Sequence, residues 1–307
     1  MLQNPAQPAV SLKRKRHRKL SDDTPWAIAM LLPNIVGFLM FMVVPIFATL
    51  YFSFTEYDLI LAPKFVGLEN YIELFHDKII GITLRNTFVF TLITVPIGMA
   101  FSLLLAVFLD QKLAMRRFYR AAYFLPSVTS MVAVAIVWQW LYNPEFGLIN
   151  YFLSLVGIKG PNWLSSSSTS LLSLAIVSIW KGAGYNMMLF LAGLQGISTS
   201  YYEASELDGA NKWKQFIHIT LPMLSPTTFF IFVMSIISSF QVFDTVMLMT
   251  SGGPGRSSSV LVHYLYQSAF QFFSMGYACA IAYLLFFIVL TITVLNMRFE
   301  KHIKEIF

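Results

Sequence analysis

The stretch WAIAMLLPNIVGFLMFMVVPIFATLYFSF, residues 26–54, holds 29 consecutive residues without a charged side chain. The apolar core of a bilayer is about 30 Å thick and an α-helix rises about 1.5 Å per residue, so roughly 20 such residues cross it. Five further runs are similarly poor in charge. The sequence therefore predicts an all-α polytopic membrane protein with six transmembrane helices, at 26–54, 86–109, 121–142, 171–194, 224–250 and 277–296.

The composition of the chain supports a membrane protein. Hydrophobic residues make up 57% of its 307 residues and charged residues 12%, about half the charged share of a typical soluble domain. One charge-poor run can be a buried helix of a soluble core, but six runs of this length argue against that explanation. A transmembrane β-barrel requires alternating segments of about ten residues, whereas these runs are continuous. The single cysteine, Cys279, excludes an internal disulfide framework.

The distribution of Lys and Arg predicts the orientation of the helices, because cytoplasmic loops are enriched in basic residues. Fifteen of the 21 basic residues fall on one side, in the segment before the first run, the second loop, the fourth loop and the C-terminal end. The other side carries five, and Lys181 lies inside a run. We therefore expect a basic cytoplasmic arm at 1–25, a transmembrane domain at 26–296 and a cytoplasmic tail at 297–307.

The sequence lacks the common signatures of nucleotide hydrolysis and of hydrolytic enzymes. It contains no G-x-x-x-x-G-K-[ST] phosphate loop, no H-E-x-x-H, no C-x-x-C and no G-x-S-x-G. Its five histidines are scattered without the spacing of metal ligands. We therefore expect no catalytic residues, no metal site and no cofactor on this chain.

The loop between the fourth and fifth runs, residues 195–222, has an unusual pattern. Ser200 and Glu203 have the spacing of a capping box, which starts a helix. Gly209 can adopt the left-handed conformation that ends one, and a second amphipathic stretch runs over 211–220 until Pro222 ends it or starts the next span. The pattern predicts a helix, a glycine turn and a second helix along the membrane surface. An amphipathic connector lying in the lipid headgroups is the alternative interpretation.

The same loop resembles a known motif. The residues Glu203-Ala204-Ser205-x-x-Asp208-Gly209-Ala210, followed by Ile219-x-Leu221-Pro222, resemble the EAA loop of permease subunits in sugar-type (carbohydrate uptake) bacterial ABC importers. Ser205 stands where the motif usually has alanine. Phe65-Val66-Gly67-Leu68-Glu69-Asn70-Tyr71 and Thr250-Ser251-Gly252-Gly253-Pro254 also resemble segments of this family, of the type of the larger permease in maltose importers.

This resemblance implies a type I ABC importer architecture and a set of partners. It implies a second permease subunit in a heterodimer, two ATPase subunits that bind ATP, and an extracytoplasmic solute-binding protein. The coupling loop 198–222 is implied to contact the ATPase through Glu203, Ala204, Asp208, Gly209 and Ala210. The resemblance further implies a multi-pass protein of the bacterial cytoplasmic (inner) membrane that imports a sugar or polyol-type solute.

Polar residues inside the runs are candidates for the solute pathway, because a charge at the bilayer centre costs at least about 2.5–3.5 kcal/mol. Lys181 and Asp244 are such residues; we expect them to pair across neighbouring helices, to contact solute, or, for Lys181, to reach toward the membrane surface. A secondary transporter with these two residues as an ion relay is the alternative function.

The resemblance extends to the pathway. Trp180, Gly182 and Tyr185 match the spacing of a stretch that contacts substrate in the maltose type, and Lys181 replaces an apolar residue there, which favours an acidic or more polar solute. Hydrogen bonds to sugar hydroxyls are expected from Asn186 and Gln241, and stacking from Tyr185, Trp138 or Phe240. The candidate pathway residues are Lys181, Gly182, Tyr185, Asn186, Ser239, Phe240, Gln241 and Asp244.

Overall fold

The computed structural model of the chain describes residues 24–111 and 114–304. Most of these residues are helical, and the two described strands, β1 (Thr55–Glu56) and β2 (Lys64–Phe65), form a short antiparallel pair. The chain divides into two units, Met1–Thr49 and Leu50–Phe307. Most of the predicted basic arm at 1–25 and the end of the predicted tail at 297–307 lie outside the described residues.

The first unit is one apolar helical segment. It contains α1 (Thr24–Phe38), a π-helical turn η1 (Leu39–Val43) and the beginning of α2 (Val44–Ser53), which ends in the second unit. Large apolar side chains are exposed on all sides of this segment, among them Trp26, Met30 and Phe41. A helix that is apolar all round fits a lipid environment. Residues 26–53 are long and apolar enough to cross a membrane, which confirms the first predicted span.

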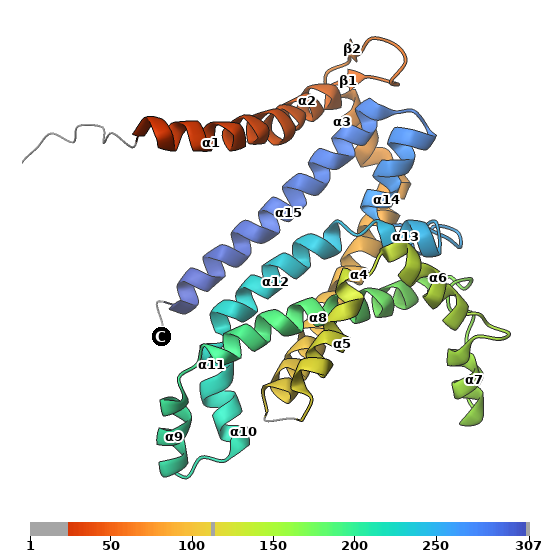
Figure 1. The fold of residues 1–307 in the computed structure, drawn as a ribbon. Helices are drawn as coiled ribbons and strands as arrows, with labels where there is room; N and C mark the ends of the chain where they lie inside the picture. The colour runs from red at the N-terminus through yellow and green to blue at the C-terminus, as the bar shows by residue number, and fades with distance from the viewer. Residues whose placement is uncertain (1–23, 112–113, 305–307) are drawn as a thin grey trace, which may run out of the picture. The chain divides into compact units, whose positions relative to one another are not determined.

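The second unit is built around four long helices (Figure 1). They are α4 (Lys78–Asp110), α8 (Ser170–Gln195), α12 (Ser225–Phe240) and α15 (Met275–Lys304). Ala106 and Leu109 of α4 pack against Met187 and Phe190 of α8 in one buried cluster. Small residues at such crossings allow helices in a membrane to approach closely, and packing then stabilises the pair.

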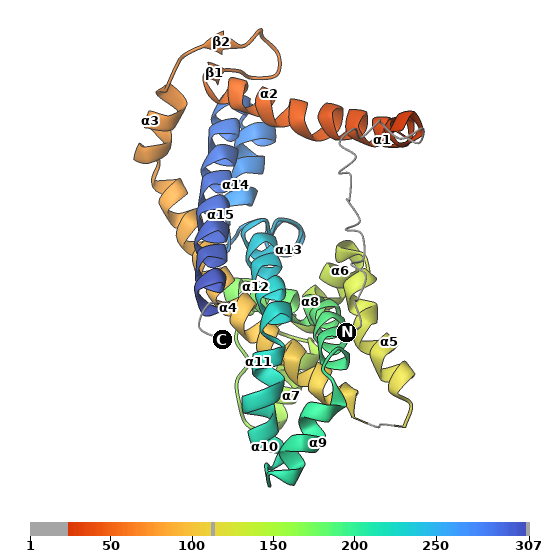
Figure 2. The ribbon, with the colours of Figure 1, turned by 90° about the vertical axis from the view of Figure 1, so that its left-hand side faces the viewer.

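Shorter elements connect these helices along the chain. They are α3 (Glu69–His76), α7 (Leu148–Leu155), α14 (Leu261–Tyr266) and the π-helical turn η3 (Gln267–Gln271). Figure 2 shows α14 beside α15, where Leu261, Tyr264 and Ile281 belong to one buried cluster. The scaffold therefore holds α14 against the first turns of α15.

The predicted continuous helix at 121–142 is wrong. The structure instead has α5 (Arg116–Val128) and α6 (Met131–Leu141), which meet at an angle of 99°. The Ser127 hydroxyl donates to the Phe124 carbonyl and the Thr129 hydroxyl to the Leu125 carbonyl. Because these side chains compete for helix carbonyls, and Pro126 has no amide proton, the local sequence favours a break.

The predicted continuous helix at 224–250 is also wrong. The helix α12 ends at Phe240, and a separate helix α13 (Asp244–Met249) follows it. On the other side, α12 is bent by 64° from the helical run of α10 (Lys212–Gln215), η2 (Phe216–Thr220) and α11 (Leu221–Met223). Within the described residues, four helices and these two bent pairs together give up to six spans, so the predicted six-span class is confirmed while two spans are broken.

A carboxylate fixes the start of α4, eight residues before the predicted start at 86. Asp77 caps the helix through a 2.7 Å hydrogen bond from the Ile79 amide to Oδ1, and its Oδ2 accepts hydrogen bonds from the hydroxyls of Tyr264 (2.6 Å) and Tyr277 (2.9 Å). Partial burial opposes ionisation, but these hydrogen bonds outweigh it and hold the pKa of Asp77 below its usual value. The cap thus joins α4 to α14 and α15.

Replacing Asp77 with asparagine is expected to lower the free energy of unfolding by about 1 kcal/mol at neutral pH, since hydrogen bonds to an ionised group are lost. A lowered folded-state pKa gives stability that is present above the unfolded-state pKa and is lost as the pH falls through the folded-state pKa. The difference between wild type and Asp77→Asn in thermal unfolding of the purified protein should therefore shrink on acidification below the ordinary carboxyl pKa of 3.8. If wild type and Asp77→Asn differ in stability by the same amount at neutral pH and below pH 3.8, the result contradicts this assignment.

Candidate functional site

The loop predicted as helix, glycine turn and helix has that structure, and we call residues 198–223 the hairpin. Its first helix is α9 (Thr199–Leu207), and its second begins with α10 at Lys212. The predicted capping box is wrong in detail, because the Ser198 hydroxyl accepts the capping hydrogen bond from the Ser200 amide (3.4 Å), and Ser200 and Glu203 lie inside α9. The helix therefore begins earlier because Ser198, with an extended backbone, already supplies the cap.

The turn of the hairpin requires glycine. Gly209 has a φ of +77°, its amide donates to the Glu206 carbonyl (3.1 Å), and the Ala210 amide donates to the Ser205 carbonyl (2.9 Å). These two bonds form a Schellman motif, which ends a helix with a left-handed residue. Asn211 then caps α10 by accepting a hydrogen bond from the Lys214 amide (2.9 Å). The predicted role of Gly209 as helix terminator is confirmed.

Buried polar contacts hold the two helices of the hairpin together. The Gln215 side chain is buried and its amide donates to the Ser205 hydroxyl at 2.9 Å. The hydroxyls of Tyr202 and Thr220 lie 3.0 Å apart. Because these partly buried bonds connect both helices, the hairpin is expected to move as one body.

The residues predicted to couple to an ATPase lie on the outside of the hairpin. Glu203, Ala204, Asp208 and Gly209 are exposed and Ala210 is half-buried. Two large apolar side chains stand exposed among them, Leu207 with 91% and Trp213 with 68% of its surface accessible. Exposed apolar side chains of this size close to acidic groups are typical of a protein interface.

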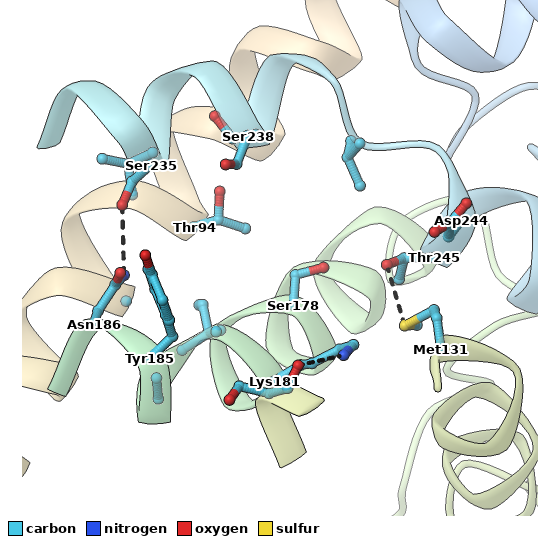
Figure 3. Close-up of a pocket in the computed structure, with 18 of the residues that line it drawn as sticks. Thr94, Met131, Ser178, Lys181, Tyr185, Asn186, Ser235, Ser238, Asp244 and Thr245 are labelled. Atoms are coloured by element: carbon cyan, nitrogen blue, oxygen red, sulfur yellow. Dashed lines mark hydrogen bonds between the residues drawn. The ribbon is translucent and has the colours of Figure 1, made fainter. Parts of the chain in front are cut away.

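A cavity of about 690 Å³ lies between α4, α5, α8 and α12 and the segment that leads into α13 (Figure 3). Hydroxyl-bearing residues, which the sequence interpretation did not identify, also line it. Two of them, Ser235 and Ser238, lie three residues apart on α12, a spacing that a search for hydroxyls within charge-free runs would have found. Seven of the eight predicted pathway residues line it: Lys181, Gly182, Tyr185, Asn186, Ser239, Gln241 and Asp244; the additional hydroxyl residues are Thr94, Ser127, Ser178, Ser235, Ser238 and Thr245.

Phe240 does not line the cavity. Its side chain is 1% exposed, and its ring meets Phe88 edge-on with 5.2 Å between ring centroids. It packs in a cluster with Val95 and Ile236. The predicted stacking of Phe240 on a sugar ring is therefore wrong in this structure, because the ring faces the contact between α4 and α12.

Tyr185 and Asn186 remain available to a solute. The Tyr185 side chain is 51% exposed, and Asn186 makes one long hydrogen bond of 3.5 Å to the Ser235 hydroxyl. Figure 3 shows both residues beside α12. Trp138, the other predicted stacking residue, instead packs against Trp180 and Tyr142 with 5.5 and 5.2 Å between ring centroids.

The two charged residues of the cavity do not pair, although the structure describes both side chains. The Lys181 ammonium donates to three backbone carbonyls at the end of α5, those of Pro126 (3.3 Å), Ser127 (3.3 Å) and Thr129 (2.9 Å). A helix end leaves carbonyls without amide partners and carries partial negative charge. The break after α5, which the sequence interpretation missed, thus supplies the partner of Lys181.

Comparison with known proteins defines the class of the chain. Residues 87–301 match the family described as binding-protein-dependent transport system inner membrane component. The chain belongs to this family and is the permease subunit of an ABC importer, a multi-pass protein of the inner membrane and not itself an enzyme. This membership does not support the alternative of a secondary transporter.

Two relatives and one solved structure illustrate the similarity. The probable ABC transporter permease protein YurN of Bacillus subtilis is 39% identical over 280 residues, covering 90% of this chain and 96% of YurN. The arabinooligosaccharides transport system permease protein AraP of the same organism is 34% identical, covering 89% of this chain and 87% of AraP. A bacterial alginate ABC transporter bound to an alginate pentasaccharide-loaded periplasmic protein has a chain with a TM-score of 0.81 and 24% identity, covering 94% and 98%, which shows the same fold.

Proposed function

We propose that this chain forms one half of the pathway by which a sugar or polyol-type solute enters the cytoplasm. A second permease subunit forms the other half, two ATPase subunits bind ATP, and an extracytoplasmic binding protein delivers the solute. Relatives are named for arabinooligosaccharides, sulfoquinovosyl glycerol and sn-glycerol-3-phosphate, which are all polyhydroxylated or polyol-derived. These names include both neutral and anionic solutes, so family membership leaves the charge of the solute open.

The exposed outer surface of the hairpin is the observation that carries this proposal. Leu207 and Trp213 offer apolar surface for burial against an ATPase, and Glu203 and Asp208 offer charge for orientation. Because the ATPases are cytoplasmic, this assignment places the hairpin and both termini in the cytoplasm, as the distribution of basic residues predicts.

Both ends of the hairpin continue into helices that line the cavity. At one end α8 finishes at Gln195, whose amide oxygen, turned toward α5, accepts hydrogen bonds from Arg120 (2.8 Å) and Arg116 (3.0 Å). At the other end α11 leads into α12. A displacement of the hairpin by ATP-driven closure of the ATPases therefore moves α8 and α12 and changes access to the cavity, as a rigid-body transmission.

Reversing the charge of Glu203 tests the docking. Glu203 is exposed on α9, so Glu203→Lys leaves the internal contacts of the hairpin intact and alters only the surface offered to a partner. We expect co-purification of the ATPase and solute uptake to fall by about tenfold or more, because like charges in an interface cost several kcal/mol. Glu145→Lys, a matched reversal on the predicted opposite side of the membrane, should not change co-purification. Full ATPase recovery with Glu203→Lys contradicts the assigned surface.

A further inference from the structure

The charged groups of the cavity indicate the class of solute that it accepts, an inference that rests on the proposed function. Among the residues that line the cavity, Lys181 and Asp244 are the two with charged side chains. Taken by sequence alone, Lys181 favours an acidic or more polar solute. The contacts of the two side chains argue against an acidic one.

The Lys181 ammonium is already occupied. A lysine has three N–H donors, and three backbone carbonyls at the end of α5 accept from it, at 2.9–3.3 Å. These carbonyls belong to the C-terminal end of a helix, where the backbone dipoles give partial negative charge. The positive charge of Lys181 is therefore offset locally, and its donors are directed at the protein and not at a solute.

Asp244 has no such partner. Its side chain is exposed at the first residue of α13, and the groups that the structure describes supply its carboxylate with no hydrogen bond and no ion pair. Figure 3 shows it on the segment beyond α12, on the side of the cavity away from Asn186. An ionised carboxylate only accepts hydrogen bonds. It therefore binds hydroxyl groups and repels carboxylates, phosphates and sulfonates.

The other available groups of the cavity are uncharged. The Tyr185 hydroxyl, the Gln241 amide and the Ser238 hydroxyl line it without a side-chain hydrogen bond to another described group. Such groups both donate and accept, as the hydroxyls of a sugar require. We propose that the cavity accepts uncharged polyhydroxylated solutes and that Asp244 excludes anionic ones.

The experiment measures binding to the full importer complex in nanodiscs, without ATP and without the binding protein, whose own preference is thereby removed. Saturation-transfer difference NMR is recorded with the neutral arabinotriose and the anionic trigalacturonate, separately and in competition. We expect wild type to prefer arabinotriose by about tenfold or more. Asp244→Asn, which keeps the size of the side chain, should reduce this preference to about twofold or less.

The matched control is Asp58→Asn, which neutralises a half-buried carboxylate outside the cavity lining. An asparagine oxygen can still accept from the Ile60 and Leu61 amides, so this variant should keep the wild-type preference. The proposal is overturned if wild type prefers trigalacturonate, if it binds neither saccharide, or if Asp244→Asn and Asp58→Asn behave alike. Because no nucleotide is present, these outcomes are independent of ATPase docking. Failure of the Glu203 experiment with the saccharide preference intact contradicts the proposed function alone.

Discussion

Replacing Gly209 with proline is expected to abolish solute uptake while the chain remains in the membrane. Gly209 has a φ of +77° and donates its amide to Glu206, whereas proline fixes φ near −65° and has no amide proton. Both hydrogen bonds of the Schellman motif then fail, and α9 and α10 lose their relative orientation. Uptake and solute-stimulated ATP hydrolysis of the reconstituted importer measure this effect.

Gly209→Asn is the matched control for this prediction. Asparagine tolerates the left-handed conformation better than other residues with a side chain, and a Cβ at this position meets no atom within 4 Å. We expect Gly209→Asn to retain most of the uptake. If Gly209→Pro also retains it, the orientation of α9 against α10 has no part in coupling.

Replacing Gly184 with alanine is expected to be strongly destabilising. A Cβ at Gly184 would lie 2.0 Å from the Tyr123 carbonyl oxygen and 2.9 Å from the Phe124 Cα. These are backbone atoms of α5, so the clash is relieved only if α5 moves away from α8. Overpacking of this kind costs about 1–3 kcal/mol, and the movement also separates Lys181 from the carbonyls that it contacts.

Gly182 offers a control on the same helix. A Cβ there meets no atom within 4 Å, and alanine favours a helix over glycine by up to about 1 kcal/mol. Thermal unfolding of the purified protein should therefore show a lower midpoint for Gly184→Ala and an equal or higher one for Gly182→Ala. Equal midpoints for both variants would contradict the tight crossing of α5 and α8.

The sequence predicted the spans well because lipid burial depends on composition over about 20 residues. It missed the breaks after α5 and α12 because they depend on single hydrogen bonds, such as those of Ser127 and Thr129 to carbonyls of the preceding turn. An apolar run has the same composition whether the helix is straight or bent. The break after α5 in turn decides the partner of Lys181, so the hypothesis that Lys181 pairs with Asp244 failed for the same reason.

The hairpin was more predictable than the cavity. Gly209 carries a local conformational signal, and the end of α9 follows from it. The face of a helix that lines a cavity depends instead on its neighbours. Phe240 and Ser239 are adjacent in sequence, yet Ser239 lines the cavity and Phe240 packs between α4 and α12. A map of charged residues does not separate these two positions, because α12 carries no charged side chain.

Site-specific cross-linking from the hairpin tests the central claim, that this surface docks an ATPase, most directly. Leu207 is 91% exposed, and the one native cysteine, Cys279, is buried, so Leu207→Cys in a Cys279→Ser background gives a single reactive thiol. Leu155→Cys on α7, where the leucine is 64% exposed, is the control on the predicted outer side. We predict that a bifunctional maleimide joins residue 207, and not residue 155, to the ATPase subunit in membranes. Cross-linking of the ATPase from residue 155, or from neither position, would contradict the account.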